Sequence, residues 1–251
     1  MVSVPLNLLP ADGETHYFGS IFLRSEADRY LSLLRETVDW RHDEIVMFGK
    51  RIVTARKVAW YGDPGCDYTY SGATKVALPW IPVLRELKTL VETRSGASFN
   101  SCLLNLYHHG GEGMAWHSDD EPEIVQESAI ASLSFGAERP FRFKRKRGEG
   151  PPISVHLEHG SLLVMAGATQ THWLHCLPKT TRVKDLRVNL TFRLIQGSGA
   201  QRPQRTILPT VGAEPFQTSS RITGLGESIP GRAEISEARG EDSGTEISTG
   251  A

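Results

Sequence analysis

The segment Trp116-His117-Ser118-Asp119 carries side chains able to do metal chemistry. On a strand, His117 and Asp119 lie two positions apart, so both would point to the same face. A neighbouring imidazole and carboxylate supply two of the three ligands in the facial triad of non-haem iron oxygenases. The third ligand must be a distant histidine, for which His172 and His175 are candidates. By itself His-x-Asp is a weak signal, because surface polar pairs supply most of its occurrences.

The segment from Arg187 to Leu194 alternates strictly between polar and apolar residues. Its polar positions are Arg187, Asn189, Thr191 and Arg193. The pattern alone favours an amphipathic strand with its polar face in water. The alternative places that face inside a barrel, where Arg193 would bind a carboxylate through a bidentate fork. Asn105 and Tyr107, also two apart on a predicted strand, would then add hydrogen bonds to the same acid. Periodicity does not decide between the two.

Short strand-like runs, broken by glycine and proline, would have to position these side chains. They are predicted at 101–107, 129–135, 141–144, 153–157, 161–165 and 187–194. Such runs without intervening helices favour a closed sandwich or jelly roll over an alternating α/β sheet.

Two helices are predicted before these strands. Ser25 would cap the first, with Asp28 at the reciprocal position. Its apolar face would consist of Ala27, Tyr30, Leu31, Leu34 and Val38. The second would begin near Trp80, with Pro82 in its first turn, and end near Gly96. Since helices come first and strands later, the predicted class is α+β.

The composition changes after Ile195. Residues 197–251 are rich in small and polar residues and contain one aromatic residue, Phe216, so they bury too little apolar surface to offset their ordering entropy. We therefore predict a folded domain over residues 1–196 and a disordered tail over 197–251.

The cysteines and the N-terminus indicate the compartment. Cys66, Cys102 and Cys176 are odd in number and scattered, which is typical of free thiols in a reducing compartment. Met1 to Pro10 lacks the basic start and apolar run of a signal peptide, and no stretch approaches the length of a membrane span. We expect a cytoplasmic protein, or a nuclear one in a eukaryote, that is neither secreted nor membrane-bound.

Charge does not by itself indicate a partner, because the formal net charge is -1. Basic residues cluster between Arg139 and Arg147, and more loosely at Lys50, Arg51, Arg56 and Lys57. Charge alone favours solvated loops for both clusters.

Several motifs taken together resemble the AlkB family of oxidative demethylases. They are Asn105-Leu106-Tyr107, His117-Ser118-Asp119-Asp120-Glu121, Ser132-Leu133-Ser134-Phe135-Gly136, His159-Gly160-Ser161-Leu162, His175 and the segment from Arg187 to Arg193. They occur in family order and at family spacing, over roughly residues 20–195. Phe48-Gly49-Lys50, Tyr61-Gly62-Asp63 and the run from Tyr68 to Gly72 are similar to the branch that repairs alkylated DNA, double-stranded DNA in particular.

The resemblance implies a double-stranded β-helix (jelly-roll) core, with the N-terminal helices packed outside it and a nucleotide-recognition part at about 40–80. It implies His117, Asp119 and His175 as iron ligands, His175 being preferred because it lies twelve residues before Arg187, as in the family. It further implies a set of residues around 2-oxoglutarate, namely Asn105, Tyr107, Arg187, Asn189 and Arg193. Arg193 is expected on the distal carboxylate, and Arg187 is expected to brace the metal side through Asp119 or the co-substrate.

For the substrate, the resemblance implies that Asp120 and Glu121 face the target base. Tyr70 stands where the DNA branch stacks an aromatic ring on the flipped base, and it replaces the expected Phe with a ring that adds a hydroxyl. Phe48 would enter the duplex as a wedge, since an apolar ring can replace lost stacking. The alternative for Phe48 is a core residue on a short strand. The basic segment from Arg139 to Arg147 would then contact phosphates as a loop.

The implied activity is oxidative demethylation of N-alkylated bases such as 1-methyladenine and 3-methylcytosine in DNA. It would use iron(II), O2 and 2-oxoglutarate and release formaldehyde, succinate and CO2. We expect a monomer. The alternatives are the same chemistry on RNA or another substrate, and a non-catalytic jelly-roll binding module.

Other histidines and glycines have less specific interpretations. His108 and His109 are expected at the surface, and His156 and His159 in structural roles. The run from Gly110 to Gly113 lacks the Lys and Ser/Thr of a phosphate loop and is expected to form a turn.

Overall fold

A computed structural model describes residues 5–47, 50–66, 68–70, 73–148 and 150–196, with the backbone alone at 43–47, 50–52, 68–70 and 73–75. The elements in chain order are β1 (Glu14–Ser20), α1 (Arg24–Thr37), β2 (Arg41–Met47), β3 (Lys50–Gly62), β4 (Tyr68–Tyr70), β5 (Ala73–Lys75), α2 (Pro82–Ser95), β6 (Ser101–Tyr107), β7 (Met114–His117), β8 (Ile130–Gly136), β9 (Arg139–Arg145), β10 (Ile153–Leu157), β11 (Ser161–Ala166), α3 (Thr169–His172), β12 (Trp173–Leu177) and β13 (Arg187–Arg193). The disordered tail predicted at 197–251 and the wedge predicted at Phe48 lie outside the described residues.

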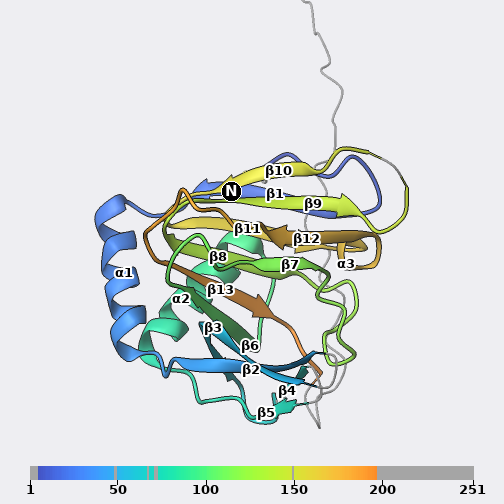
Figure 1. Cartoon of the computed structure of the whole chain (residues 1–251). Coiled ribbons are helices and arrows are strands. Elements are labelled where there is room, and N and C mark those ends of the chain that lie inside the picture. The colour runs from blue at the N-terminus through green and yellow to red at the C-terminus, as the bar shows by residue number, and fades with distance from the viewer. Residues whose placement is uncertain (1–4, 48–49, 67, 71–72, 149, 197–251) are drawn as a thin grey trace, which may run out of the picture. The chain divides into compact units, whose positions relative to one another are not determined.

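Two antiparallel sheets form the body of the described chain (Figure 1). The larger has seven strands in the order β1-β11-β8-β13-β6-β3-β2, and the smaller has four in the order β10-β9-β12-β7. Strands far apart in sequence therefore pair side by side, as β13 does between β8 and β6. The predicted α+β class and jelly-roll core are confirmed. A short hairpin, β4-β5, is separate from both sheets.

The helices cover one face of the larger sheet, as predicted (Figure 1). Leu34 on α1 and Leu84 and Leu87 on α2 are fully buried in one apolar cluster with strand residues such as Leu133 and Phe192. Burying each of these side chains contributes about 1.5–3 kcal/mol. The helices therefore occupy one face of the sheet and leave the other to face the smaller sheet.

Strand β13 shows how the two faces are divided. Val188, Leu190 and Phe192 are fully buried in the cluster under the helices. Because side chains alternate along a strand, the polar residues of β13 project from the opposite face, into the space between the two sheets. The structure thus decides what periodicity left open: the polar face of this strand points inward, not into bulk water.

Helix boundaries agree with the prediction at three ends and differ at the fourth. Helix α2 has Pro82 in its first turn and ends at Gly96, whose φ of 68° is the left-handed conformation that glycine adopts readily. The predicted cap at Ser25 is wrong, because the N-cap of α1 is Leu23, two residues earlier, and the helix begins at Arg24. The Glu26 carboxylate accepts a hydrogen bond from the Leu23 backbone N–H at 2.9 Å, so the reciprocal partner is Glu26 and not Asp28.

The expected order of helices first and strands later is also wrong in detail. Strand β1 precedes α1, and β2 and β3 lie between the two long helices. The last residues of β3, from Val58 to Tyr61, are all buried. They therefore lack the period-two alternation that would have identified this strand.

Two further observations concern the cysteines and the helices. All three cysteines are free thiols, as predicted, and the structure shows that all three are buried. Within the described part of the chain, no helix is long and apolar enough to cross a membrane.

Candidate active site

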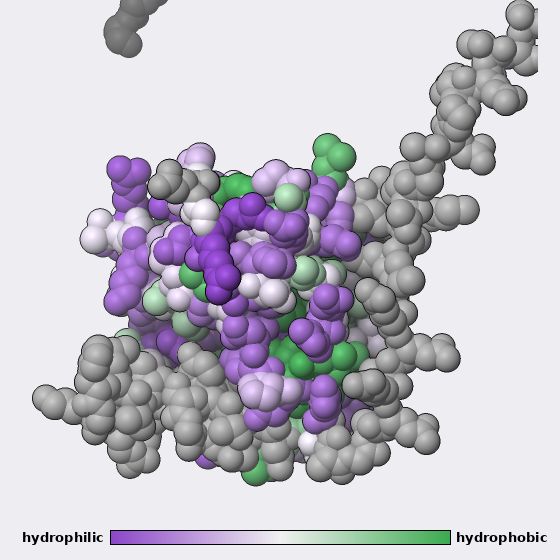
Figure 2. All heavy atoms as spheres, turned by 90° about the vertical axis from the view of Figure 1, so that its right-hand side faces the viewer, coloured by the Kyte–Doolittle hydropathy of each residue, from purple (hydrophilic) through white to green (hydrophobic). Residues whose placement is uncertain are grey.

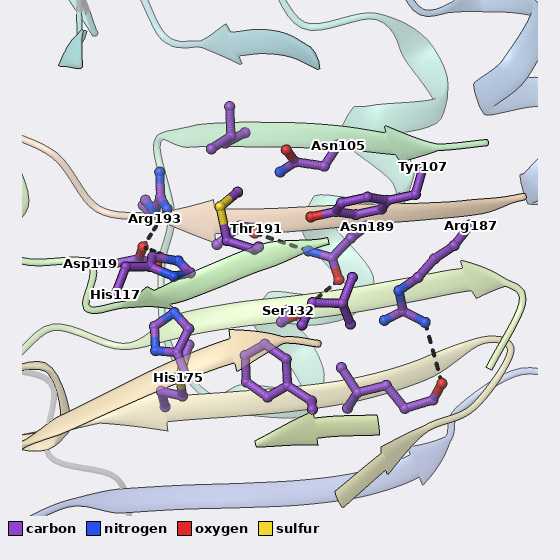
Figure 3. Close-up of a pocket in the computed structure, with 16 residues that line it drawn as sticks. Asn105, Tyr107, His117, Asp119, Ser132, His175, Arg187, Asn189, Thr191 and Arg193 are labelled. Atoms are coloured by element: carbon purple, nitrogen blue, oxygen red, sulfur yellow. Dashed lines mark hydrogen bonds and ion pairs between the residues drawn. The ribbon is translucent and has the colours of Figure 1, made fainter. Parts of the chain in front are cut away.

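A pocket lies between the two sheets, and its polar lining comes from both (Figure 3). The larger sheet contributes Asn105 and Tyr107 from β6, Ser132 from β8, and Arg187, Asn189, Thr191 and Arg193 from β13. The smaller sheet contributes His117 from β7 and His175 from β12, with Asp119 just beyond the end of β7. The sequence predicted most of this set, and the sheet topology brings it together.

The three predicted metal ligands converge at one end of the pocket. His117 and His175 are direct partners in the β7-β12 pairing, and their ring centroids lie 4.3 Å apart. The candidate ligand atoms of His117, Asp119 and His175 all lie within 4.8 Å of one another. His172, the alternative weighed from the sequence, is not part of this group and is exposed on α3.

The protonation states at this end suit a cation. Burial by itself would raise the pKa of the Asp119 carboxyl. Arg193, whose Nη2 lies 2.8 Å from Asp119 Oδ1, acts in the opposite direction, as do the two histidines. The net effect is a pKa lowered to about 2. Burial lowers the pKa of His175 to about 3, against the attraction of Asp119. At neutral pH the Asp119 carboxylate is therefore ionised and the His175 imidazole is neutral. These are the protonation states in which both side chains bind metals.

The hydrogen bonds of the two histidines also fit an iron(II) ion. Nδ1 of His117 lies 2.8 Å from the Ala115 carbonyl oxygen and must donate to it, which leaves Nε2 as the lone-pair atom. Nδ1 of His175 is buried and has no hydrogen-bond partner among the described residues. Together with the carboxylate of Asp119, these residues fit the two-histidine, one-carboxylate triad.

The far end of the pocket is built around Arg187 (Figure 3). Its guanidinium is 1% exposed and donates to Ser134 Oγ at 2.5 Å and to the carbonyl oxygens of Ala137 and Leu157 at 3.1 and 3.3 Å. Burial lowers the pKa of Arg187 to about 10, so it remains charged at neutral pH. Burial raises the pKa of the neighbouring Tyr107 hydroxyl, which is therefore a donor. A buried positive charge beside a phenol is suited to a carboxylate.

The positions expected for the two arginines are reversed. Arg193, not Arg187, lies at Asp119, and Arg187 lies at the opposite end of β13. Six residues along a strand span about 20 Å, so the two cannot exchange roles. The sequence placed both arginines on one face, but it did not indicate which end of the strand adjoins the metal ligands.

Ser132 and Ser134 belong to the site although the sequence assigned them no role. Both hydroxyls donate to Oδ1 of Asn189, at 3.0 and 3.2 Å, and Nδ2 of Asn189 donates to Thr191 Oγ1 at 3.1 Å. These bonds fix the amide of Asn189 beside Arg187. Two serines alternating within the otherwise apolar strand β8 were the signal that could have revealed them.

The segment predicted to be a phosphate-contacting loop is mostly strand β9. Arg139 is 1% exposed and donates to the carbonyl oxygens of Gly110, Glu112 and Pro178 at 3.2, 3.1 and 2.7 Å. It therefore supports the turn at Gly110 to Gly113, which forms as expected, and it cannot reach a phosphate. The prediction is wrong for this residue and for the loop conformation.

The basic residues at the C-terminal end of β9 already have acceptors or aromatic partners. The Lys144 ammonium lies 4.7 Å from the centroid of the Trp116 ring, and Arg145 pairs with Asp12. Lys146 pairs with Asp120 at 3.0 Å. Strands β9 and β13 run toward the face of the molecule that is shown in Figure 2. The described residues on this face are mostly hydrophilic and surround a small apolar area.

The residues expected at the target base are described unequally. Asp120 is exposed beside the triad, where it accepts hydrogen bonds from Ser118 and Lys146, and Glu121 is half-buried. Tyr70 ends strand β4, but its side chain is outside the described atoms. Phe48 is outside the described residues altogether.

His159 and His108 have partners in the protein framework. His159 accepts the Gly136 backbone N–H at Nδ1, 2.8 Å away, and its Nε2 lies 3.1 Å from Asp28 on α1. Nδ1 of His108 lies 3.0 Å from the Glu112 carboxylate. The structural role expected for His159 is therefore observed.

Comparisons with known proteins agree with this geometry. A family model described as the 2OG-Fe(II) oxygenase superfamily matches residues 14–193. The chain is 41% identical over 197 residues to the DNA oxidative demethylase ALKBH2 of Mus musculus, covering 74% of this chain and 82% of that protein. It is also 41% identical over 182 residues to the alpha-ketoglutarate-dependent dioxygenase alkB homolog 3 of Homo sapiens, covering 68% of this chain and 62% of that protein.

A solved structure supports the fold independently. The structure of OsALKBH1 superposes with a TM-score of 0.51 at 15% identity, covering 76% of this chain and 100% of that one. The expected cofactors, iron(II) and 2-oxoglutarate, are those of the matching family, and the complete triad argues against a binding module that has lost its chemistry. The chain therefore belongs to the AlkB family of iron(II)- and 2-oxoglutarate-dependent dioxygenases, with AlkB-type oxidative dealkylation of nucleic acids as its chemistry.

Proposed function

We propose that this protein removes alkyl groups from N-alkylated bases in DNA, such as 1-methyladenine and 3-methylcytosine, including bases in duplexes. The observation that carries the proposal is a metal triad and a buried, charged arginine at opposite ends of one pocket. The choice of DNA is supported by 41% identity to proteins named DNA oxidative demethylase, over most of their length.

Within the pocket, we assign 2-oxoglutarate to the space between Arg187 and the triad. Arg187 would bind the distal carboxylate, since it is charged, buried and remote from Asp119. Tyr107 and Asn105 would donate to the same acid from β6, and Asn189 would lie along it. Arg193 would hold Asp119 in place and face the metal end of the co-substrate.

Bound iron(II), with 2-oxoglutarate and O2, supplies the oxidant that removes the alkyl carbon as formaldehyde. The chain's own residues hold and shield that chemistry. His117, Asp119 and His175 would hold the metal, and the pocket beside them would take the co-substrate and the base. Apolar lining such as Phe141, Met165 and Leu177 excludes water from the pocket. No side-chain nucleophile is required.

The target base would enter from the side of Asp120 and Glu121. Lys144, which lies over the Trp116 ring, and Lys146, which pairs with Asp120, would have to turn from these partners to contact phosphates near this opening. Phe48 would fill the gap left by the flipped base, and the ring of Tyr70 would stack on that base.

A turnover assay tests the substrate. Single- and double-stranded DNA and RNA oligonucleotides, each carrying 1-methyladenine or 3-methylcytosine, would be compared at equal concentration. We expect turnover on DNA of both forms, with formaldehyde formed in proportion to repaired base. Turnover confined to RNA would contradict the DNA assignment and favour the same chemistry on RNA.

The wedge has its own test. Phe48→Ala is expected to reduce kcat/KM on duplex DNA more than on single strands, because only the duplex needs its stacking replaced. Equal losses on both would favour a core role for Phe48.

A further inference from the structure

The backbone of Asp119 is held from outside its own strand. Strand β7 ends at His117, and Asp119 lies two residues beyond it while being 4% exposed. Its backbone N–H therefore has no partner in the sheet ladder, and a buried donor left unpaired costs about 1–3 kcal/mol. The side-chain oxygen of Gln170 accepts this N–H at 2.9 Å.

Gln170 is itself fixed at both ends of its amide. Its Nε2 lies 3.5 Å from the sulfur of Met165 on β11. The residue before it, Thr169, is 1% exposed, and its hydroxyl accepts from the Glu14 N–H at 2.8 Å and donates to the Ala166 carbonyl at 2.7 Å. The short helix α3 that carries Gln170 is therefore anchored to β1 and β11.

The same helix leads directly into the strand that carries His175. Helix α3 ends at His172 and β12 begins at Trp173. A hydrogen bond from Asp119 to Gln170 thus connects the backbone of one triad residue to the element that positions another. Arg193 holds the Asp119 carboxylate from the other side, at 2.8 Å.

We propose that Gln170 is a positioning residue of the metal site, which sets the separation of Asp119 from His175 through the Asp119 backbone. This inference rests on the proposed assignment of His117, Asp119 and His175 as metal ligands. Residues that orient metal ligands through hydrogen bonds typically contribute 10–100-fold to metal affinity, and Gln170 would act at the backbone of the ligand instead of its side chain.

The test measures Mn(II) binding alone, by calorimetry and electron paramagnetic resonance, without O2, 2-oxoglutarate or nucleic acid. Gln170→Met keeps the length of the side chain but removes the acceptor, and it should weaken Mn(II) binding by about tenfold or more. Gln170→Glu keeps an acceptor oxygen and should bind Mn(II) within a few-fold of the wild type. Thr171→Met, on an exposed position of the same helix, is the matched control and should bind normally.

Two results would overturn the role of Gln170. Wild-type affinity in Gln170→Met would show that the hydrogen bond does not matter, and equal losses in Gln170→Met and Gln170→Glu would assign the effect to packing. If Gln170→Met does not fold, Gln170→Ala takes its place: the proposal requires a loss of Mn(II) affinity of about tenfold or more in Gln170→Ala with near-normal affinity in Gln170→Glu, and any other pair of results refutes it. A wild-type protein that binds no Mn(II) would overturn the metal site itself, whatever the nucleic-acid substrate is.

Discussion

At the scale of single residues, the site is organised by charges buried at its two ends. Asp119 and Arg193 form an ion pair in which each side chain is 4% exposed. Arg187 is equally buried at the other end, but it donates to neutral oxygens. Because, among the described residues, Arg193 has a carboxylate partner and Arg187 does not, their removal should have different consequences.

We therefore predict that Arg187→Met weakens 2-oxoglutarate binding, whereas Arg193→Met lowers the stability of the metal-free protein. Losing a charge-assisted contact of about 1.5–3 kcal/mol should raise the KM for 2-oxoglutarate about 10–100-fold in Arg187→Met, with Mn(II) binding little changed. Arg193→Met leaves Asp119 buried without its counter-ion, so the metal-free protein should lose about 3–5 kcal/mol of unfolding free energy in urea. Arg35→Met, at an exposed position of α1, is the control. A larger rise in KM for Arg193→Met than for Arg187→Met would contradict this order of roles.

The pKa values of Asp119 and His175 predict how the metal-free protein responds to acid. The pKa of Asp119 is lowered in the fold to about 2, so its stabilising effect is present above its unfolded pKa near 4 and is lost as pH falls toward 2. The pKa of His175 is lowered to about 3, so below pH 6.5 the unfolded chain takes up a proton that the folded chain excludes. Both effects reduce stability as pH falls.

Thermal unfolding in the presence of a chelator measures this response. The melting temperature should fall between pH 6.5 and pH 4, where His175 is the titrating group of the two. His175→Gln, which has no proton to gain, should show a shallower fall over the same range. An identical pH profile in this variant would contradict a buried, neutral His175.

The candidate metal ligands could be predicted from the sequence, whereas a residue that only holds a ligand in position could not. His117, Asp119 and His175 could be found because their spacing and order belong to a recognisable family. Gln170 could not, since it meets Asp119 across 51 residues of sequence and carries no distinctive motif. The order of Arg187 and Arg193 also depended on which end of β13 lies beside β7, and that is a property of sheet topology.

At the scale of elements, β13 has two functions on its two faces. Val188, Leu190 and Phe192 hold the helices to the sheet, while Arg187 and Arg193 project into the pocket. The alternation was plain in the sequence, but the same pattern fits a strand with one face in water. Only the presence of a second sheet over the polar face makes that face a binding site.

Phe192→Ala tests the apolar face. Phe192 is fully buried beside Phe99 and Trp80, with ring centroids 6.0 and 6.5 Å away. The variant should lose about 3–5 kcal/mol of unfolding free energy, measured by urea denaturation, because a cavity replaces the ring. Thr181→Ala, at an exposed position between β12 and β13, should change it by less than about 0.5 kcal/mol. A loss below about 1 kcal/mol for Phe192→Ala would contradict the packing.

At the scale of the whole molecule, the described residues contain the complete triad and pocket. Their C-terminal end is anchored, since Ile195 is 2% exposed and the Gln196 N–H donates to the Glu123 carbonyl at 2.7 Å. The composition of residues 197–251 predicts a domain boundary after residue 196, and this stays a prediction.

We expect a chain ending at Gln196 to keep its fold and its chemistry. Its melting temperature should lie within a few degrees of the full chain, and its kcat should change less than about twofold, because the described residues that line the pocket lie between Leu103 and Arg193. Comparison of the two proteins by thermal unfolding and turnover checks this. A truncated protein that loses its cooperative transition would place part of the domain after residue 196.

The most direct measurement of the central claim is the joint yield of formaldehyde and succinate from DNA that contains 1-methyladenine. With iron(II), O2 and 2-oxoglutarate, we predict that the wild-type protein restores adenine and releases one formaldehyde per repaired base. Asp119→Ala leaves Arg193 buried without its partner and should be less stable, but its folded form, checked by circular dichroism, should give less than about one percent of this turnover because the triad loses its carboxylate. No formaldehyde from the wild-type protein, or undiminished turnover in Asp119→Ala, would contradict the account.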